Sequence, residues 1–420
     1  MYKKIILENG LRIMLVPNKN TQAVTVLAVV GAGSKYETKQ NNGISHFVEH
    51  MFFKGTKKRP NTLAISETLD RVGGFYNAFT SKEYTGYFAK VDSKHTDLAL
   101  DWVSDIFLNS KIDSKEIEKE RGVIIEELNM YLDTPVRHIR DLFESLLYGD
   151  QPAGWEIVGT KENLKKVQRK DFIDYIQNHY TAKNTIVCVS GNFSQEKMIK
   201  DIKRKFGAIN KKQPKDKVKI TEEQKEPQIY LKFKETDQTH FCLGVRAFDL
   251  FSPKIYVQEV LATILGGNMS SRLFIKVREK NGLAYYIKTE AESFTDSGYL
   301  VTQAGVPHNA LSKAIAMILK EYKSLSDKII TESELKKAKD YLKGNLVLSL
   351  ESSDALASFY AGQELLTNRI LTLKEECAKI DKVKTTEVRA LAKEIFKKES
   401  LNLAVIGPHK NQSSLEKLLI

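Results

Sequence analysis

The sequence has little cysteine and no long apolar run. Its three cysteines, Cys188, Cys242 and Cys377, are odd in number and far apart, so no zinc-finger or redox spacing exists. We therefore expect buried free thiols in a reducing compartment rather than a secreted protein stabilised by disulfides. No apolar stretch reaches the length that spans a bilayer, so we expect no membrane segment.

The N-terminus lacks the features of a secretory signal. Two lysines are followed by only a short apolar run, and no small-residue cleavage site follows it. We expect instead a hairpin, with strands at 4–7 and 11–16 joined by a turn at residues 8–10. The expected location is therefore cytoplasmic.

The positive charge is not concentrated in any one region. The net charge of +12 over 420 residues is compatible with binding to nucleic acid or to an anionic surface. The lysines, however, are scattered among acidic residues, and no aromatic and basic nucleic-acid motif is present. We interpret the charge as a solvated, lysine-rich surface. A nucleic-acid-binding protein, which would lose affinity steeply with salt, is the alternative that charge alone suggests.

A polar stretch divides the chain into two halves. Residues 210–228 (NKKQPKDKVKITEEQKEPQ) contain two prolines and many charges, as a linker does. We expect an N-terminal domain at 1–209, a linker at 210–228 and a C-terminal domain at 229–420.

The two halves repeat one order of elements. In each half a strand that begins with Gly-Tyr, at Gly86 and at Gly298, leads into an amphipathic helix. Each half ends in an apolar strand stopped by glycine, TIVCVSG at Gly191 and LNLAVIG at Gly407. We predict an α+β fold of two homologous, duplicated domains, each a mainly antiparallel sheet with helices packed on one face. A chance similarity of two α+β segments is the alternative.

The sharpest motif is HFVEH at residues 46–50. On a helix, residues four apart share a face with Cβ atoms about 5–6 Å apart, so His46 and His50 can present two imidazoles to one ion. Glu49 leans toward the same face, where a base can take a proton from water without ligating the metal. The alternative is a pair of surface or core histidines, although a chance HxxEH is expected only about once in a hundred chains of this composition.

A third ligand is expected from the segment 113–133, which we predict to be a helix. Catalytic zinc usually has three protein ligands and one open position. Glu120 and Glu127 are two turns apart along nearly the same stripe, and a carboxylate close to an apolar stripe needs a partner such as a metal. From the residues alone both glutamates are candidates. The expected buried side of this helix comprises Ile117, Val123, Ile124, Leu128 and Tyr131.

HxxEH is the inverted zinc-binding motif, and essentially the whole chain resembles the pitrilysin/insulinase family of metallopeptidases. It is most similar to the short-chain branch that includes mitochondrial processing peptidases and bacterial processing-peptidase-like proteins. GISHFVEHMFFKGT resembles the family's metal helix and ERGVIIEEL its second zinc segment. The resemblance implies one Zn2+ per chain, with Glu127 as the third ligand and Glu120 as an accompanying acid. Glu126, which points about 100° away on the helix, ranks below Glu127.

Two further segments resemble substrate-contacting parts of this family. The stretch 73–87 is similar to the edge strand that binds substrate beside the zinc, and it implies main-chain contacts at Asn77, Ala78 and Phe79. The stretch GGNMSSRLFIKVREKNGLAYY is similar to the segment whose arginine and tyrosine reach the active site, here Arg278 and Tyr285. The alternatives are an ordinary sheet strand, an arginine that caps a helix and a buried strand tyrosine.

The resemblance implies a zinc-dependent endopeptidase that hydrolyses unfolded or extended peptides, such as oligopeptides or presequence-like segments, in a closed chamber. Glu49 would be its general base. Long-chain relatives join four homologous domains, so this two-domain chain implies a homodimer. The alternative within the family is a non-catalytic partner subunit of a processing-peptidase-like complex, against which the intact Glu49 argues.

Overall fold

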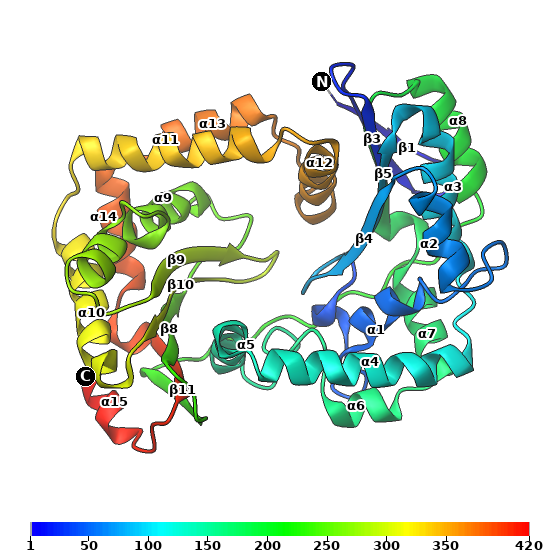
Figure 1. The fold of residues 1–420 in the computed structure, drawn as a ribbon. Helices are drawn as coiled ribbons and strands as arrows, with labels where there is room; N and C mark the ends of the chain where they lie inside the picture. The colour runs from blue at the N-terminus through cyan, green and yellow to red at the C-terminus, as the bar shows by residue number, and fades with distance from the viewer. Residues whose placement is uncertain (1, 420) are drawn as a thin grey trace. The chain divides into compact units, whose positions relative to one another are not determined.

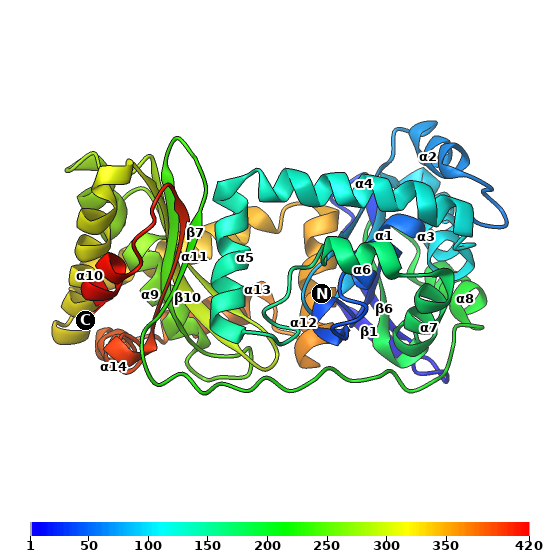
Figure 2. The ribbon, with the colours of Figure 1, turned by 90° about the horizontal axis from the view of Figure 1, so that it is seen from below.

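The computed structural model describes residues 2–419, which form two compact units that each contain one sheet (Figure 1). Unit 1 comprises Met1–Asn129, Trp155–Val218 and Leu348–Ile370. Unit 2 comprises Met130–Gly154, Lys219–Val347 and Leu371–Ile420. Residues 207–227 contain no helix or strand (Figure 2).

The sheet of unit 1 has the strand order β1-β2-β6-β3-β5-β4. Its strands β2 and β6 are parallel, and all its other neighbours are antiparallel. The pairing of β1 with β2 confirms the predicted N-terminal hairpin. The strands are β1 (Lys3–Ile6), β2 (Arg12–Pro17), β3 (Ala23–Val30), β4 (Phe75–Thr80), β5 (Thr85–Asp92) and β6 (Thr185–Gly191).

The sheet of unit 2 has the order β7-β11-β8-β10-β9, with β7 and β11 parallel and the rest antiparallel. Apart from β1, the two sheets correspond strand by strand, and in each the parallel pair lies at the same place. The α+β class and the duplication are therefore confirmed. The strands are β7 (Gln228–Phe233), β8 (Thr239–Arg246), β9 (Tyr286–Ser293), β10 (Gly298–Val306) and β11 (Leu401–Gly407).

Helices from the same half of the chain cover one face of each sheet. In unit 1, α3 packs on β3 and β5, while α1 contacts β4. In unit 2, α9 contacts β9 and β10, and α10 and α14 pack together beside it. The helices of the first half are α1 (Ile44–Met51), α2 (Thr62–Asp70), α3 (Thr96–Asn109), α4 (Ser114–Leu132), α5 (Pro135–Tyr148), α6 (Lys161–Lys166), α7 (Arg169–His179) and α8 (Gln195–Phe206). Those of the second half are α9 (Ile255–Gly266), α10 (Leu311–Asp327), α11 (Glu332–Ser349), α12 (Ser353–Thr367), α13 (Leu373–Asp381), α14 (Thr385–Ile395) and α15 (Ser413–Leu419).

The other face of each sheet is covered by a helix from the opposite half of the sequence. Helix α12 packs on β3 and β6 of unit 1, where Ala357 and Tyr360 join a cluster with Leu27. Helix α5 packs on β11 and β8 of unit 2 (Figures 1 and 2), where Phe143 lies against Tyr299. Both sheets are thus covered on two faces, where the sequence analysis predicted helices on one.

This exchange changes the domain ranges. Residues 130–154 belong to unit 2 and residues 348–370 to unit 1, so the compact units differ from the predicted ranges 1–209 and 229–420 at these two segments. The physical reason is that an amphipathic helix buries its apolar stripe on whichever sheet face is available, and sequence periodicity does not say which sheet that is.

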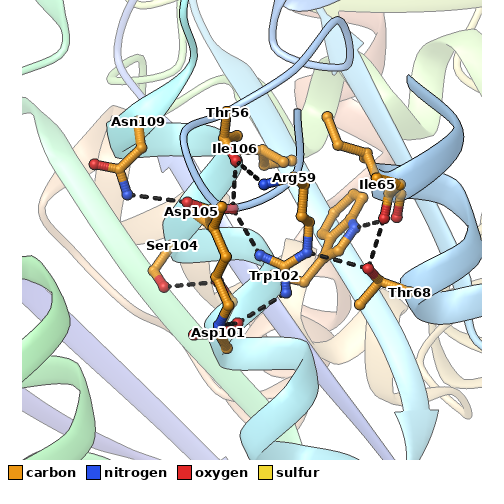
Figure 3. A network of polar contacts seen from close by, with 12 residues as sticks. Thr56, Arg59, Ile65, Thr68, Asp101, Trp102, Ser104, Asp105, Ile106 and Asn109 are labelled. Carbon is orange, nitrogen blue, oxygen red and sulfur yellow. Dashed lines mark hydrogen bonds and ion pairs between the residues drawn. The ribbon is translucent and has the colours of Figure 1, made fainter. Parts of the chain in front are cut away.

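A buried polar network fixes the segment that follows α1 to helix α3 (Figure 3). Arg59 donates to Asp101 and to Asp105 over 2.8 and 2.6 Å, and Thr56 donates to Asp105 over 2.7 Å. The side chains of Arg59 and Asp105 are almost fully buried, and charges in such surroundings persist only when they are paired and hydrogen-bonded. The network therefore gives the C-terminal end of α1 a defined position.

Candidate metal centre

Helix α1 is short and mostly buried, and its N-terminus is held by a buried carboxylate. Gly43 precedes it with a φ of 100°, a conformation that favours glycine. Glu37 accepts hydrogen bonds from the backbone amides of Gly43 and Ser45, each over 2.8 Å, and from Asn42 over 2.9 Å. Burial raises the pKa of Glu37, and these hydrogen bonds to its carboxylate oppose the shift. The helix that carries the HFVEH motif is thus anchored before its first histidine.

Three predicted metal ligands converge. The rings of His46 and His50 have centroids 4.6 Å apart, and the Oε2 atom of Glu127 lies 3.7 Å and 3.5 Å from their Nε2 atoms. Among the residues that the structure describes, these three form the one group of histidine, cysteine and acidic side chains whose ligand atoms all lie within 4.8 Å of one another. Helices α1 and α4 therefore bring together residues that are 77 positions apart, from His50 to Glu127.

The donor set fits a zinc ion. A tetrahedral zinc with ligands at about 2.0–2.1 Å requires donor atoms roughly 3.4 Å apart, and the two nitrogen–oxygen distances are close to that value. Burial, with a smaller contribution from His50, lowers the pKa of His46 to about 3, so its ring is neutral and can offer a lone pair. Two imidazoles and one carboxylate also match the ligand types of catalytic zinc sites that keep an open position.

Glu120 supports His50 from the side opposite the cluster. Its Oε1 atom lies 2.9 Å from Nδ1 of His50, and its Oε2 atom lies 2.5 Å from the amine of Lys54. Burial raises the pKa of Glu120, but the hydrogen bonds with His50 and Lys54 outweigh this effect and the net pKa is lowered. An ionised Glu120 holds the proton of His50 on Nδ1 and directs Nε2 toward Glu127, as acids behind ligating histidines do.

Glu49 lies beside the cluster and is held by the end of strand β4. The hydroxyl of Thr80 donates to Oε2 of Glu49 over 2.5 Å. Burial raises the pKa of Glu49 above its ordinary value, while the hydrogen bond from Thr80 opposes that shift. A carboxylate with a raised pKa is a better proton acceptor near neutral pH than an exposed one.

Residues 12–161, which include the whole cluster, match the family described as Insulinase (Peptidase family M16). Residues 166–342 match the Peptidase M16 inactive domain. The chain belongs to the insulinase family of peptidases.

Relatives in this family match almost the entire chain. A Bacillus subtilis protein named uncharacterized zinc protease YmxG is 39% identical over 414 residues, which cover 99% of this chain and 100% of the relative. A Mycobacterium leprae protein with a zinc protease name is 33% identical and covers 98% of this chain and 93% of the relative. A solved protease structure from Helicobacter pylori has a TM-score of 0.90 at 25% identity, over 97% of this chain and 100% of that one.

The fold also occurs in more distant proteins. A chain of Complex III2 from Candida albicans has a TM-score of 0.86 at 21% identity, covering 99% of each chain. At that identity the similarity concerns the fold alone. Among residues 2–419 of this insulinase-family chain, none of the helices combines the length and apolar character that crossing a membrane requires.

Helix α4 presents Glu127 on a partly exposed stripe. The predicted helix at 113–133 is found as Ser114–Leu132, and Ile117, Ile124 and Leu128 are buried as expected. The prediction for Val123 is wrong, because its side chain is 53% exposed. Val123 lies one turn before Glu127, so it shares the open stripe of the helix rather than the packed one.

The predicted substrate strand is at the edge of its sheet. Strand β4 pairs only with β5 among the described strands, and α1 packs beside it (Figure 1). Asn77 is exposed, and Ala78 lies opposite Tyr87. The ring of Phe79 packs over Gly86 and against Tyr84, so Phe79 can offer a peptide its main chain more readily than its side chain. An edge strand of this kind can pair with an extended peptide.

Arg278 and Tyr285 lie close to each other in unit 2. Arg278 is in a π-helical turn, Phe274–Glu279, and its guanidinium lies 4.7 Å from the ring centre of Phe274 and 6.0 Å from that of Tyr285. π-Helical turns are rare and often occur at functional sites. Tyr285 is 73% exposed, so the alternative of a buried strand tyrosine is wrong. The part that this pair plays in the reaction stays a prediction.

Three supporting residues were missed by the sequence analysis. Lys54 follows His50 by one helical turn, a spacing that could have indicated a shared acid partner. Thr80 ends the predicted substrate strand, where a polar residue carries little signal. Glu37 precedes the motif by nine residues, and its contact with the helix N-terminus depends on a chain reversal that no periodicity reveals.

Proposed function

We propose that this chain is a zinc-dependent endopeptidase in which His46, His50 and Glu127 hold one Zn2+ ion. The observation that carries the proposal is the convergence of three ligand atoms beside an acid, Glu49, that is held apart from them by Thr80. Membership in the insulinase family and the zinc protease names of the relatives support the same activity.

In this proposal, the zinc ligands, Glu49 and the pair Arg278 and Tyr285 have different roles in peptide hydrolysis. Zinc held by such a set polarises a carbonyl and makes water more acidic. Glu49 accepts a proton from the attacking water and delivers it to the leaving amine nitrogen. Arg278 and Tyr285, on the strength of the family resemblance, stabilise the oxyanion or hold a substrate carbonyl.

The proposed substrates are unfolded or extended peptides. Strand β4 offers an unpaired edge next to the helix that carries Glu49, and a peptide that adds to this edge binds through its main chain with little dependence on side chains. Oligopeptides and presequence-like segments are the substrates that we propose, because their extended main chain can pair with the free edge of β4.

The decisive experiment compares Glu49→Gln with the parent protein and with Glu259→Gln. Glu259 is a partly buried glutamate on α9, the helix that packs beside the edge strand of unit 2. Cleavage of a random peptide library and bound zinc are measured for all three. We expect Glu49→Gln to retain zinc and to cleave about 100- to 10,000-fold more slowly, and Glu259→Gln to match the parent. Equal cleavage by Glu49→Gln would refute the role of Glu49 as the general base, and no cleavage by the zinc-loaded parent would favour the non-catalytic partner subunit.

We also propose that the protein works as a homodimer in the cytoplasm, enclosing the peptide in a chamber. The support is the presence of two repeated units in one chain, where long-chain members of the family join four. Light scattering gives the oligomeric state. Mixing two inactive variants, Glu49→Gln and Tyr285→Phe, restores cleavage only if Tyr285 acts on the site of the partner subunit.

A further inference from the structure

The turn that follows the proposed substrate strand contains a buried ion group that the mechanism does not use. The carboxylate of Glu83 lies 3.0 Å from the amine of Lys35 and also pairs with the amine of Lys217. The side chains of Lys35 and Glu83 are 1% and 3% exposed, and that of Lys217 is 11% exposed. Charges so far from water are costly, so their presence needs a reason.

The first lysine fixes the turn to the body of unit 1. Lys35 donates its backbone N–H to the carbonyl of Lys82 over 2.8 Å, and Ser34 donates to the carbonyl of Ser81 over 3.3 Å. Gly33 permits this approach, because a Cβ atom there would lie 2.2 Å from the carbonyl oxygen of Ser81. The turn between β4 and β5 is therefore held by backbone bonds on one side and by the ion pair on the other.

The second lysine comes from the segment that leaves unit 1. Lys217 is one residue before Val218, the last residue of this part of the unit, and the next residue, Lys219, belongs to unit 2. Over residues 207–227 the chain contains no helix or strand. Lys217 is thus a side-chain anchor of this segment, and its partner is the turn that ends strand β4.

We propose that Glu83 and Lys217 are positioning residues that hold the edge of β4 in the conformation that accepts a peptide, so that the connecting segment 210–228 tunes substrate binding. The inference rests on the proposed function for the role of β4. Glu83 lies three residues after Thr80, the last residue of that strand. Loss of the Lys217 contact frees one side of the turn and loosens the strand edge, without touching any metal ligand.

The test compares Lys217→Met with Lys219→Met, which removes the same charge from an exposed position two residues away. Lys217→Met leaves Glu83 paired with Lys35, so no buried charge loses its last partner and the protein is expected to fold. Lys217→Arg, which keeps the cation, is expected to behave like the parent.

Two readouts are measured on the full-length, zinc-loaded chain. Hydrogen exchange of the amides in residues 75–85 is expected to be roughly tenfold faster in Lys217→Met than in Lys219→Met. The KM for an extended peptide is expected to rise about three- to tenfold with kcat within about twofold, as happens when binding common to ground and transition states is lost. Zinc content is expected to stay unchanged.

The outcomes separate this inference from the proposed function. If Lys217→Met and Lys219→Met show the same exchange and the same KM, the positioning role is refuted. A fall in zinc content or in thermal stability that lowers kcat and leaves KM unchanged indicates a merely structural role and also refutes it. If the parent cleaves no peptide but the exchange of residues 75–85 still rises only in Lys217→Met, the proposed function fails while the anchoring of the strand stands.

Discussion

The two units repeat one fold but balance charge in different ways. In unit 1, helix α1 beside the edge strand carries His46 and His50. Together with Glu127 these histidines place three metal-ligand atoms close to one another. In unit 2, the corresponding helix α9 contains no histidine, and Arg140 from α5 donates to Glu290 and Glu292 of the edge strand over 2.7 and 3.0 Å.

This difference in side chains shows how one of two duplicated domains can carry a metal site that the other lacks. Acidic groups beside the edge strand of unit 2 receive a cation that is built into the chain, the guanidinium of Arg140. Burial raises the pKa of the neighbouring Glu259 to about 7, and the negative charges of Glu292 and Glu290 add to this shift. In the cluster of unit 1, two imidazoles and one carboxylate instead face one another, and this set of donor atoms suits a divalent ion.

The largest expected effect comes from breaking the metal cluster of unit 1. Replacement Glu127→Gln removes the anionic ligand, and we expect zinc affinity to fall by more than about 100-fold, beyond the usual effect of a residue that only supports a ligand. Glu126→Gln is the matched control, because Glu126 is exposed at the preceding position of the same helix. Zinc content after dialysis against a chelator gives the comparison. Equal zinc retention by both variants would contradict the assignment of Glu127.

A graded version of this test concerns Glu120. Replacement Glu120→Gln leaves all three ligands but weakens the ionic hydrogen bond that orients His50. We expect a loss of zinc affinity of about 10- to 100-fold, smaller than that of Glu127→Gln. Competition with a chromophoric chelator measures both. A loss for Glu120→Gln that exceeds the loss for Glu127→Gln would reverse the roles of the two glutamates, which the spacing of the sequence alone left open.

In unit 2, the corresponding test removes the cation, Arg140, that pairs with the acidic residues of the edge strand. Replacement Arg140→Met leaves Glu290 and Glu292 without the guanidinium and deprives the buried hydroxyl of Tyr299 of a hydrogen-bond donor. We expect a loss of about 2–3 kcal/mol in the free energy of unfolding, with unchanged zinc content.

The matched control is Arg137→Met on the same helix, because Arg137 is exposed and its loss is expected to cost less than about 0.5 kcal/mol. Denaturant unfolding followed by circular dichroism compares the two variants. If Arg140→Met instead lowers zinc content and leaves the free energy of unfolding unchanged, Arg140 serves metal binding rather than stability. The proposed difference between the two units would then be wrong.

Much of the fold and of the metal cluster could be predicted from the sequence because both rest on local spacing. The i, i+4 relation of His46 and His50 predicts a shared helical face, and the periodicity of residues 114–132 predicts the helix of Glu127. The order of strands and helices in each half sufficed to predict the duplication. These inferences need only the geometry of single elements.

The rest depends on contacts that no local pattern encodes. Helices α5 and α12 are amphipathic, but their apolar stripes do not reveal that each covers the sheet of the other half. Val123 reads as part of the apolar side of α4 and yet stays exposed beside Glu127. The burial of Glu37 and Glu83 could not be predicted either. Charged residues are expected to be solvated, and only the tertiary fold shows which partners bury them.

The smallest expected effect is a pH dependence of stability, which distinguishes the ionic network of Asp101 in unit 1 from that of Arg140 in unit 2. In unit 1, the carboxylate of Asp101 accepts a hydrogen bond from Arg59 (Figure 3) and others from Lys205 and Lys58. One anion thus pairs with three cations, whereas in unit 2 one guanidinium pairs with two carboxylates. Burial would raise the pKa of Asp101, but the hydrogen bonds from these cations outweigh it and hold the pKa well below 3.8. A lowered folded-state pKa contributes stability above about pH 4, and this stability is lost as the pH falls further.

Replacement Asp101→Asn is therefore expected to cost about 1–2 kcal/mol at neutral pH, a modest value because the site is partly exposed. The difference between parent and variant should shrink steadily below about pH 4, since protonation of Asp101 in the unfolded parent then favours unfolding. Asp97→Asn on the same helix, where Asp97 is exposed, is expected to change stability little at any pH. Unfolding free energies measured from pH 7 to pH 3 give the test. A difference in unfolding free energy that stays constant over this range would mean that Asp101 stabilises the fold by packing rather than by its charge. The ionic networks of the two units would then not differ in how they balance charge.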